Sequence, residues 1–201
     1  MKIETTEAEV QNKLFTIAEY LAMEGISVEK NQFDNGKIIP MAGGTYEHNL
    51  ISANCIGAVG NKLKEIGKPC VVLSSDQKIQ VAAFGRFFYA DGSVVCDGPQ
   101  FFEGRRDVIE NPTLIIEVAS ESTELFDRTE KFERYSSLSS FKEYVLVSQK
   151  QPHVEVWTFV AANVWEVRIY KKMEDKVVFK TLDCSIDFEK IYENIVFEKI
   201  E

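Results

Sequence analysis

Two acidic residues, Asp91 and Glu117, stand in apolar surroundings where an unpaired charge is costly. Asp91 separates the apolar segments 87–90 and 93–96, and Glu117 lies inside the apolar run 113–119, which is typical of a strand buried on both faces. A carboxylate there must be paired, hydrogen-bonded or bound to a cation. Two acids on neighbouring strands can converge on one hard metal ion, which prefers oxygen ligands. The pattern therefore indicates the framework of a metal-dependent phosphodiesterase site.

The elements that must position these acids follow from capping signals, turn signals and hydrophobic periodicity. Thr16 and Glu19 form a capping box, Thr45 caps a long amphipathic segment, and Asp34-Asn35-Gly36 is a hairpin turn. The expected helices cover residues 16–24, 46–66, 124–138 and 187–192. The expected strands cover residues 26–33, 37–41, 70–73, 77–81, 87–96 (broken at Asp91), 114–118, 143–148, 154–160, 164–170 and 176–181. This order predicts a mixed α/β domain around a central sheet.

Length and composition favour one well-packed domain. The chain has 201 residues, of which 45% are hydrophobic, and this is enough for a sizeable core. It contains no apolar run of about 18 residues, so we expect no membrane span. The acidic start lacks the apolar centre of a signal peptide, and we expect a cytoplasmic protein.

The charge and the cysteines limit the function classes. A net charge of −9 counts against nucleic-acid binding, although a locally basic patch or bound metal ions can supply the missing positive charge. Cys55, Cys70, Cys96 and Cys184 are scattered without C-x-x-C spacing, so we expect small, buried, reduced side chains. The sequence has no G-x-S-x-G or H-E-x-x-H motif and only two histidines, which disfavours a histidine-based triad or a zinc site.

Several stretches, taken in order, resemble a known group of proteins. They are residues 15–20, 34–39, 41–44, His48, 89–91, 94–96, 114–120, 122–123, 127–135 and 143–147. Together they resemble the Uma family of restriction-endonuclease-like proteins, a branch of the PD-(D/E)XK nuclease superfamily. The resemblance implies a restriction-endonuclease-like central mixed β-sheet flanked by helices, with an N-terminal helix-hairpin extension. It implies one domain over 1–201, divided into the helix and hairpin at 14–41, the nuclease core at 45–160, and C-terminal strands with a short helix at 161–201.

The resemblance also implies site roles. Asp91 matches the aspartate of "PD", after Ala90 in place of proline, and Glu117 matches the acidic member of "(D/E)XK". Asp91, Glu117 and the Val118 carbonyl would bind Mg²⁺ (or Mn²⁺), and DNA would be the substrate. The lysine would be Lys131, on the following helix, because the usual position holds Ala119.

Other candidates have competing interpretations. Lys131 stands in a charge-rich run of the kind found on solvated helix faces, where it could simply pair with Asp127 four residues earlier. Tyr135 could line the site or pack against the sheet. His48 could assist the site or make a structural hydrogen bond, and Asp76 could be a turn residue or a group behind the site. Gln32 stands where the family usually has a glutamate. If that glutamate belongs to the site, the glutamine would weaken one ligand or hydrogen bond.

Two functions therefore compete. The first is a Mg²⁺-dependent DNA endonuclease, in which Lys131 assists the attacking water or the transition state. The second is a catalytically inactive nuclease-fold module for binding or assembly, which Gln32, the acidic charge and the displaced lysine favour. In either case the apolar strands after residue 142 could form a homodimer interface.

Overall fold

The computed structural model describes residues 13–120 and 123–197. The helices are α2 (Ile17–Glu24), α3 (Tyr46–Glu65), α4 (Glu124–Phe126), α5 (Phe132–Ser136) and α6 (Phe188–Ile191), with a π-helical turn (Asp127–Lys131) between α4 and α5. Two short 3₁₀ turns span Ala82–Phe84 and Phe102–Gly104. The predicted helices 16–24, 46–66 and 124–138 are confirmed to within two residues at each end, and the predicted helix over 187–192 is one turn long.

The strands divide among three sheets. A six-stranded sheet has the order β11 (Val164–Tyr170), β10 (Val154–Ala161), β9 (Glu143–Ser148), β8 (Leu114–Ala119), β6 (Gly92–Cys96), β3 (Cys70–Ser74). A five-stranded sheet has the order β2 (Lys37–Pro40), β1 (Asn31–Asp34), β5 (Arg86–Tyr89), β4 (Lys78–Val81), β7 (Val108–Ile109). Strands β12 (Lys176–Phe179) and β13 (Cys184–Asp187) form a separate ribbon. The mixed α+β class with a central mixed sheet and flanking helices is thus confirmed, and the N-terminal hairpin strands belong to a second sheet.

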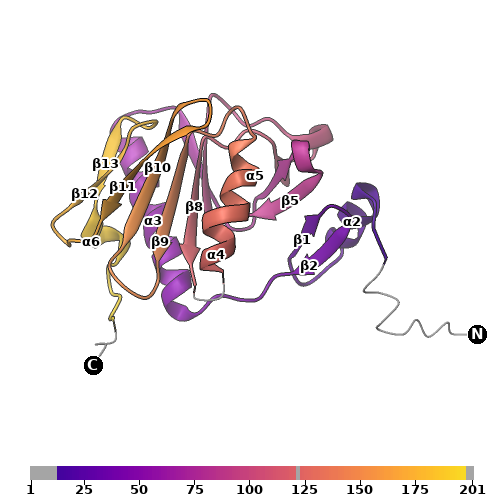
Figure 1. Cartoon of the computed structure of the whole chain (residues 1–201), viewed down its shortest axis with the longest axis horizontal. Coiled ribbons are helices and arrows are strands. Elements are labelled where there is room, and N and C mark those ends of the chain that lie inside the picture. Colours follow the sequence, from indigo (N-terminus) through magenta and orange to yellow (C-terminus); the bar gives the residue numbers. More distant parts are fainter. Residues whose placement is uncertain (1–12, 121–122, 198–201) are drawn as a thin grey trace, which may run out of the picture.

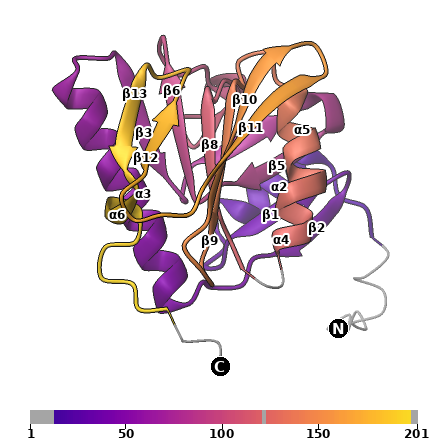
Figure 2. The same cartoon turned by 60° about the vertical axis from the view of Figure 1, so that its left-hand side comes forward.

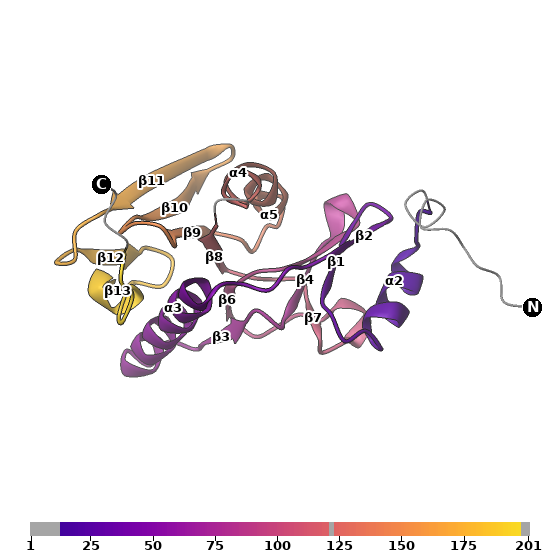
Figure 3. The ribbon, with the colours of Figure 1, turned by 90° about the horizontal axis from the view of Figure 1, so that it is seen from below.

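The central strand β8 decides which side of the sheet carries the acidic site. It is buried along its whole length and runs parallel to β9 and antiparallel to β6. Because side chains alternate along a strand, Ile116 and Val118 pack with α3, whereas Ile115 and Ala119 pack with Tyr135 of α5. Figures 2 and 3 show α3 and the α4–α5 helices on opposite sides of β8. Glu117 therefore lies on the α4–α5 side.

The N-terminal extension is fixed by local signals, as predicted. The Thr16 hydroxyl accepts from the Glu19 N–H at 3.2 Å, and the Thr16 N–H donates to the Glu19 carboxylate at 2.8 Å, which completes the capping box. Asn35 and Gly36 have φ values of 47° and 88°, as a type I′ hairpin turn requires. The hairpin then extends the five-stranded sheet, because β1 also pairs with β5.

The connection from β2 to α3 lies next to the end of β8. In Figure 1 it passes along the lower edge of the molecule, past the end of β8 and beneath α4. Thr45 caps α3 by accepting from the His48 N–H at 3.2 Å. This arrangement puts His48 in the first turn of α3, close to the end of β8 that carries Glu117 and Val118.

One strand prediction was wrong at its boundaries. The strand expected over 26–33 begins only at Asn31, because the chain after α2 forms a turn in which Ser27 bonds to the Glu29 carbonyl and Val28 is fully exposed. The predicted break of the segment 87–96 at Asp91 is confirmed. It divides at Asp91 into β5 and β6, which belong to different sheets, so Asp91 lies at the junction of the two sheets.

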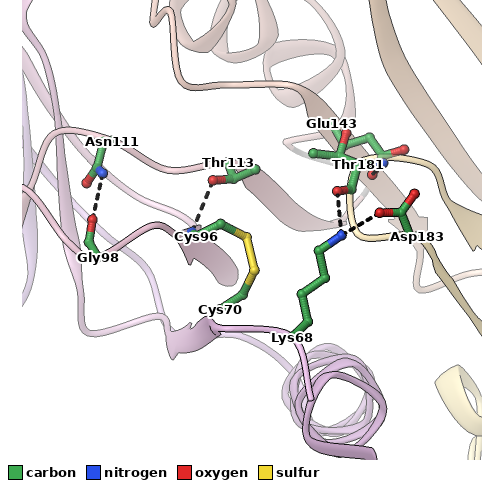
Figure 4. Close-up of a disulfide and its surroundings, with 9 residues drawn as sticks. All are labelled: Lys68, Cys70, Cys96, Gly98, Asn111, Thr113, Glu143, Thr181 and Asp183. Atoms are coloured by element: carbon green, nitrogen blue, oxygen red, sulfur yellow. Dashed lines mark hydrogen bonds and ion pairs between the residues drawn. A yellow bond between two sulfur atoms is a disulfide. The ribbon is translucent and has the colours of Figure 1, made fainter. Parts of the chain in front are cut away.

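The prediction of four reduced cysteines was also wrong. Cys55 and Cys184 are free and buried, but Cys70 and Cys96 form a disulfide between β3 and β6 (Figure 4). The two residues stand directly opposite each other in the antiparallel register. Their separation of 26 residues gives no hint of this register, which only the pairing of the two strands creates.

We expect the disulfide to contribute measurably to stability. Closing a loop with a sequence separation of 26 lowers the entropy of the unfolded chain, which corresponds to about 3.5 kcal/mol in the loop-closure treatment. Urea unfolding of the wild type with and without reductant should show this loss, and a C70A/C96A variant should be insensitive to reductant. Equal stability of the wild type with and without reductant would contradict the prediction. Thiols are usually kept reduced in the cytoplasm, so the disulfide does not support the predicted cytoplasmic location, which stays a prediction.

No helix in the described part of the chain is long and apolar enough to span a membrane.

Candidate active site

Asp91 is held at the junction of the two sheets by contacts from both sides. Its Oδ2 accepts a hydrogen bond from the Val118 N–H at 2.7 Å, which fixes the carboxylate beside the residue that follows Glu117. The same oxygen lies 3.2 Å from Nε2 of His48. The tertiary fold thus places Asp91 next to β8 from one direction and next to α3 from the other.

Glu117 and Lys131 form a buried ion pair on the α4–α5 side of β8. Lys131 Nζ lies 2.8 Å from Glu117 Oε1, and the two side chains are only 6% and 3% exposed. The Tyr135 hydroxyl, one turn further along the helix, donates to the same oxygen at 3.4 Å. The interpretation of Lys131 as part of a solvated helix face is therefore wrong, because the charged end of its side chain points at the sheet.

Asp127 is a further buried charge beside this ion pair, and sequence reasoning missed it as a site residue. Its Oδ1 lies 3.4 Å from Lys131 Nζ, and its side chain is 6% exposed. The residue stands at the start of the π-helical turn, and its backbone carbonyl accepts from the Tyr144 hydroxyl at 2.8 Å. Single π turns inside helices are frequent at functional sites. The spacing of four residues between Asp127 and Lys131 was the available signal.

The contacts set the charge states of Asp91 and His48. The hydrogen bond to Asp91 raises the pKa of His48, and the nearby carboxylate charge raises it further. Burial alone would raise the pKa of Asp91, but His48, Lys131 and the Val118 N–H together lower it below its usual value. Asp91 therefore remains an ionised ligand candidate at neutral pH.

Burial and an excess of negative charge act on the central pair. Burial raises the pKa of Glu117 well above its usual value, and although Lys131 opposes this, Asp91 and Asp127 add to it. Burial would lower the pKa of Lys131, but the surrounding carboxylates raise it above its usual value, so the ammonium group stays charged. Three carboxyl groups thus share one lysine, and an added cation would favour the ionised form of Glu117.

The residues gather around one pocket of about 670 Å³. Among the sequence-predicted candidates, those that line it are Gln32, His48, Asp91, Glu117, Val118 and Lys131. Tyr135 stands behind Glu117 and is fully buried. Asp76 lies outside the pocket on an exposed turn, where it pairs with Lys30.

Gly44 lets the chain pass close to His48. A Cβ atom at this position would lie 2.6 Å from Nδ1 of His48, closer than such atoms approach each other. Nδ1 is buried and has no hydrogen-bond partner among the described residues. The absence of a side chain at Gly44 therefore lets the imidazole lie against the β2–α3 connection with Nε2 turned toward Asp91.

Comparison with known proteins places this chain in a family. The Uma2 family, described as "Putative restriction endonuclease", matches residues 17–187. The chain belongs to the Uma2 family. The match covers every residue that lines the pocket, and it supports a nuclease-like function.

Two relatives and one solved structure extend the comparison. The uncharacterized proteins sll1609 and slr1290 of Synechocystis sp. are 32% and 31% identical to this Uma2 chain; the matches cover 76% and 89% of it, and 85% and 92% of the relatives. A crystal structure described as a putative nuclease belonging to DUF820, from Anabaena variabilis, has a TM-score of 0.70 at 14% identity. It covers 89% of this chain and 97% of its own, which shows a shared fold.

The donor set of this Uma2 chain suits a hard cation with water ligands. Asp91 uses Oδ2 for its contacts with Val118 and His48, Glu117 uses Oε1 for its contacts with Lys131 and Tyr135, and both acids line the pocket. Among the described residues, no three His, Cys, Asp or Glu side chains stand close enough to hold a metal by themselves. Two carboxylates, a backbone carbonyl and waters fit Mg²⁺, which usually keeps several waters.

Proposed function

We propose that the protein is a metal-dependent DNA endonuclease that hydrolyses phosphodiester bonds. One observation carries the proposal: the Asp91 carboxylate accepts from the N–H of Val118, directly after Glu117, in the pocket that also holds Lys131. Asp91, Glu117 and the Val118 carbonyl would hold Mg²⁺ or Mn²⁺. When bound, such an ion polarises the scissile phosphate and lowers the pKa of a water molecule.

The chain's own residues have separate tasks in this proposal. His48 holds Asp91 ionised and oriented through its contact at 3.2 Å. Lys131, whose pKa is raised by three carboxylates, stays protonated at neutral pH. It therefore serves to stabilise negative charge that develops on the phosphate, rather than to remove a proton from water.

Gln32 supports a second candidate function. Its amide side chain lines the pocket where the family usually has a glutamate, so one negative charge is missing from the cation site. A protein that keeps the fold and binds nucleic acid or a partner without cleavage would suit this loss. A homodimer stays a prediction; the edge strand β11 leaves Val164, Val167 and Ile169 exposed.

A cleavage assay separates the two functions. Purified protein with Mg²⁺ or Mn²⁺ should cleave plasmid or single-stranded DNA to products with a 5′-phosphate and a 3′-hydroxyl, and a chelator should abolish the reaction. In parallel, Mn²⁺ should raise the thermal midpoint, because a ligand that binds only the folded state stabilises it. Stabilisation by Mn²⁺ without cleavage of any DNA would favour the non-catalytic module. If the protein neither cleaves DNA nor is stabilised by Mn²⁺, the proposed cation site would be wrong as well.

A further inference from the structure

We infer that the pocket takes an unpaired DNA strand rather than an intact duplex, an inference that rests on the proposed function. The first reason is that the candidate catalytic side chains are largely buried in the pocket. The side chains of Glu117 and Lys131 are 3% and 6% exposed, and that of Asp91 is 19% exposed. A reacting phosphate must therefore enter the pocket instead of touching residues on an open surface.

The second reason is the charge of the lining. Its described residues include three carboxyl groups and a single lysine, Lys131, which is already paired with Glu117. Proteins that hold duplex DNA neutralise several backbone phosphates with lysine and arginine. This pocket offers no such row, and a bound cation would offset only the phosphate that reacts.

The third reason is the apolar wall that shares the pocket with the charged residues. Ile39, Pro40, Met41 and Ala42 line the pocket from β2 and the connection to α3, and Phe126 lines it from α4. Ile39 is 42% exposed although it is a large hydrophobic residue on an edge strand. Apolar surface beside a phosphate site suits the faces of unpaired bases, which a duplex keeps stacked inside.

Binding to matched oligonucleotides tests the inference apart from catalysis. With Ca²⁺ in place of Mg²⁺, fluorescence anisotropy should show a labelled single strand binding at least about tenfold more tightly than the duplex of the same sequence. Because few phosphates are neutralised, the logarithm of affinity should fall with the logarithm of salt with a slope smaller than about 2 between about 50 and 200 mM. Equal or tighter binding of the duplex would overturn the inference, and so would a steep salt dependence.

Variants of the apolar wall add a second readout. I39A and M41A should each weaken single-strand binding about five- to tenfold, since each removes apolar contact area. I169A is the matched control, because Ile169 is 55% exposed on the edge strand β11, outside the pocket, and it should bind like the wild type. Wild-type binding by both wall variants would also overturn the inference. Selective binding without cleavage under Mg²⁺ or Mn²⁺ would leave the inference standing and remove the endonuclease proposal alone.

Discussion

Replacing Asp91 by asparagine should reduce metal-dependent DNA cleavage on the order of 10³-fold, because a bound cation contributes several kcal/mol of charge stabilisation in the transition state. Asparagine keeps an oxygen that can accept from the Val118 N–H, so the strand junction should remain intact. Initial rates of cleavage with Mn²⁺, measured beside thermal midpoints with and without Mn²⁺, check the expectation. The variant should fold like the wild type and lose the stabilisation by Mn²⁺.

D76N is the matched control for this variant. Asp76 is also an aspartate, but its side chain is 80% exposed and lies outside the pocket. Its substitution should leave both the cleavage rate and the Mn²⁺ effect unchanged. Full activity of D91N, or equal losses in D91N and D76N, would show that the Asp91 carboxylate does not bind the catalytic cation.

Replacing Lys131 by methionine should destabilise the fold by about 3–5 kcal/mol at neutral pH, the range for breaking one side of a buried ion pair. The loss arises because Glu117 stays buried without its counter-charge, with Asp91 and Asp127 nearby. Urea unfolding of K131M against the wild type measures the free energy of unfolding.

The pH dependence of this loss has a definite sign. Burial raises the folded-state pKa of Glu117 above the ordinary value of 4.5, so the folded state favours the protonated carboxyl. The loss in K131M relative to the wild type should therefore be smallest below about pH 4.5 and should grow as the pH rises above it, because only the ionised carboxylate lacks its counter-charge. The double variant K131M/E117Q should recover most of the stability at neutral pH, since glutamine carries no charge. A destabilisation of K131M that stays constant with pH would contradict this account.

K176M is the control for K131M, because it also removes the lysine of an ion pair, but of an exposed one. Lys176 lies 2.7 Å from Asp187, but both side chains are mostly exposed to solvent. Water screens such a pair and solvates the aspartate when the lysine is removed, so little change in stability is expected. The contrast between Lys131 and Lys176 isolates the effect of burial.

Local sequence signals predicted those elements well that depend on contacts between residues close together in the chain. The Thr16 capping box and the Asn35-Gly36 turn involve residues three positions apart or fewer, and both form as predicted. Glu117 was also readable, because a carboxylate inside an apolar run must have a buried partner. Asp91 required the family resemblance, since an aspartate before Gly92 is equally typical of a turn.

Long-range pairing decided what the sequence left open. Cys70 and Cys96 face each other only because β3 and β6 pair in one register, so the disulfide could not be predicted from their spacing. The charge-rich run around Lys131 permitted either a solvated face or a site. The rotation of the helix against β8 decided between them, because it turns Lys131 and Asp127 inward toward Glu117.

The sequence by itself determined the element types, the mixed α/β class and the one acid, Glu117, that stands inside an apolar run and cannot stay unpaired, because these depend on composition and near-neighbour spacing. Only the tertiary structure decided that Asp91 lies at the junction of two sheets, bonded to the Val118 N–H and facing His48. Only it showed the apolar wall of the pocket, which joins Ile39 of β2 to Phe126 of α4. Contacts between residues so far apart depend on strand order and register, and periodicity along the chain does not encode either of them.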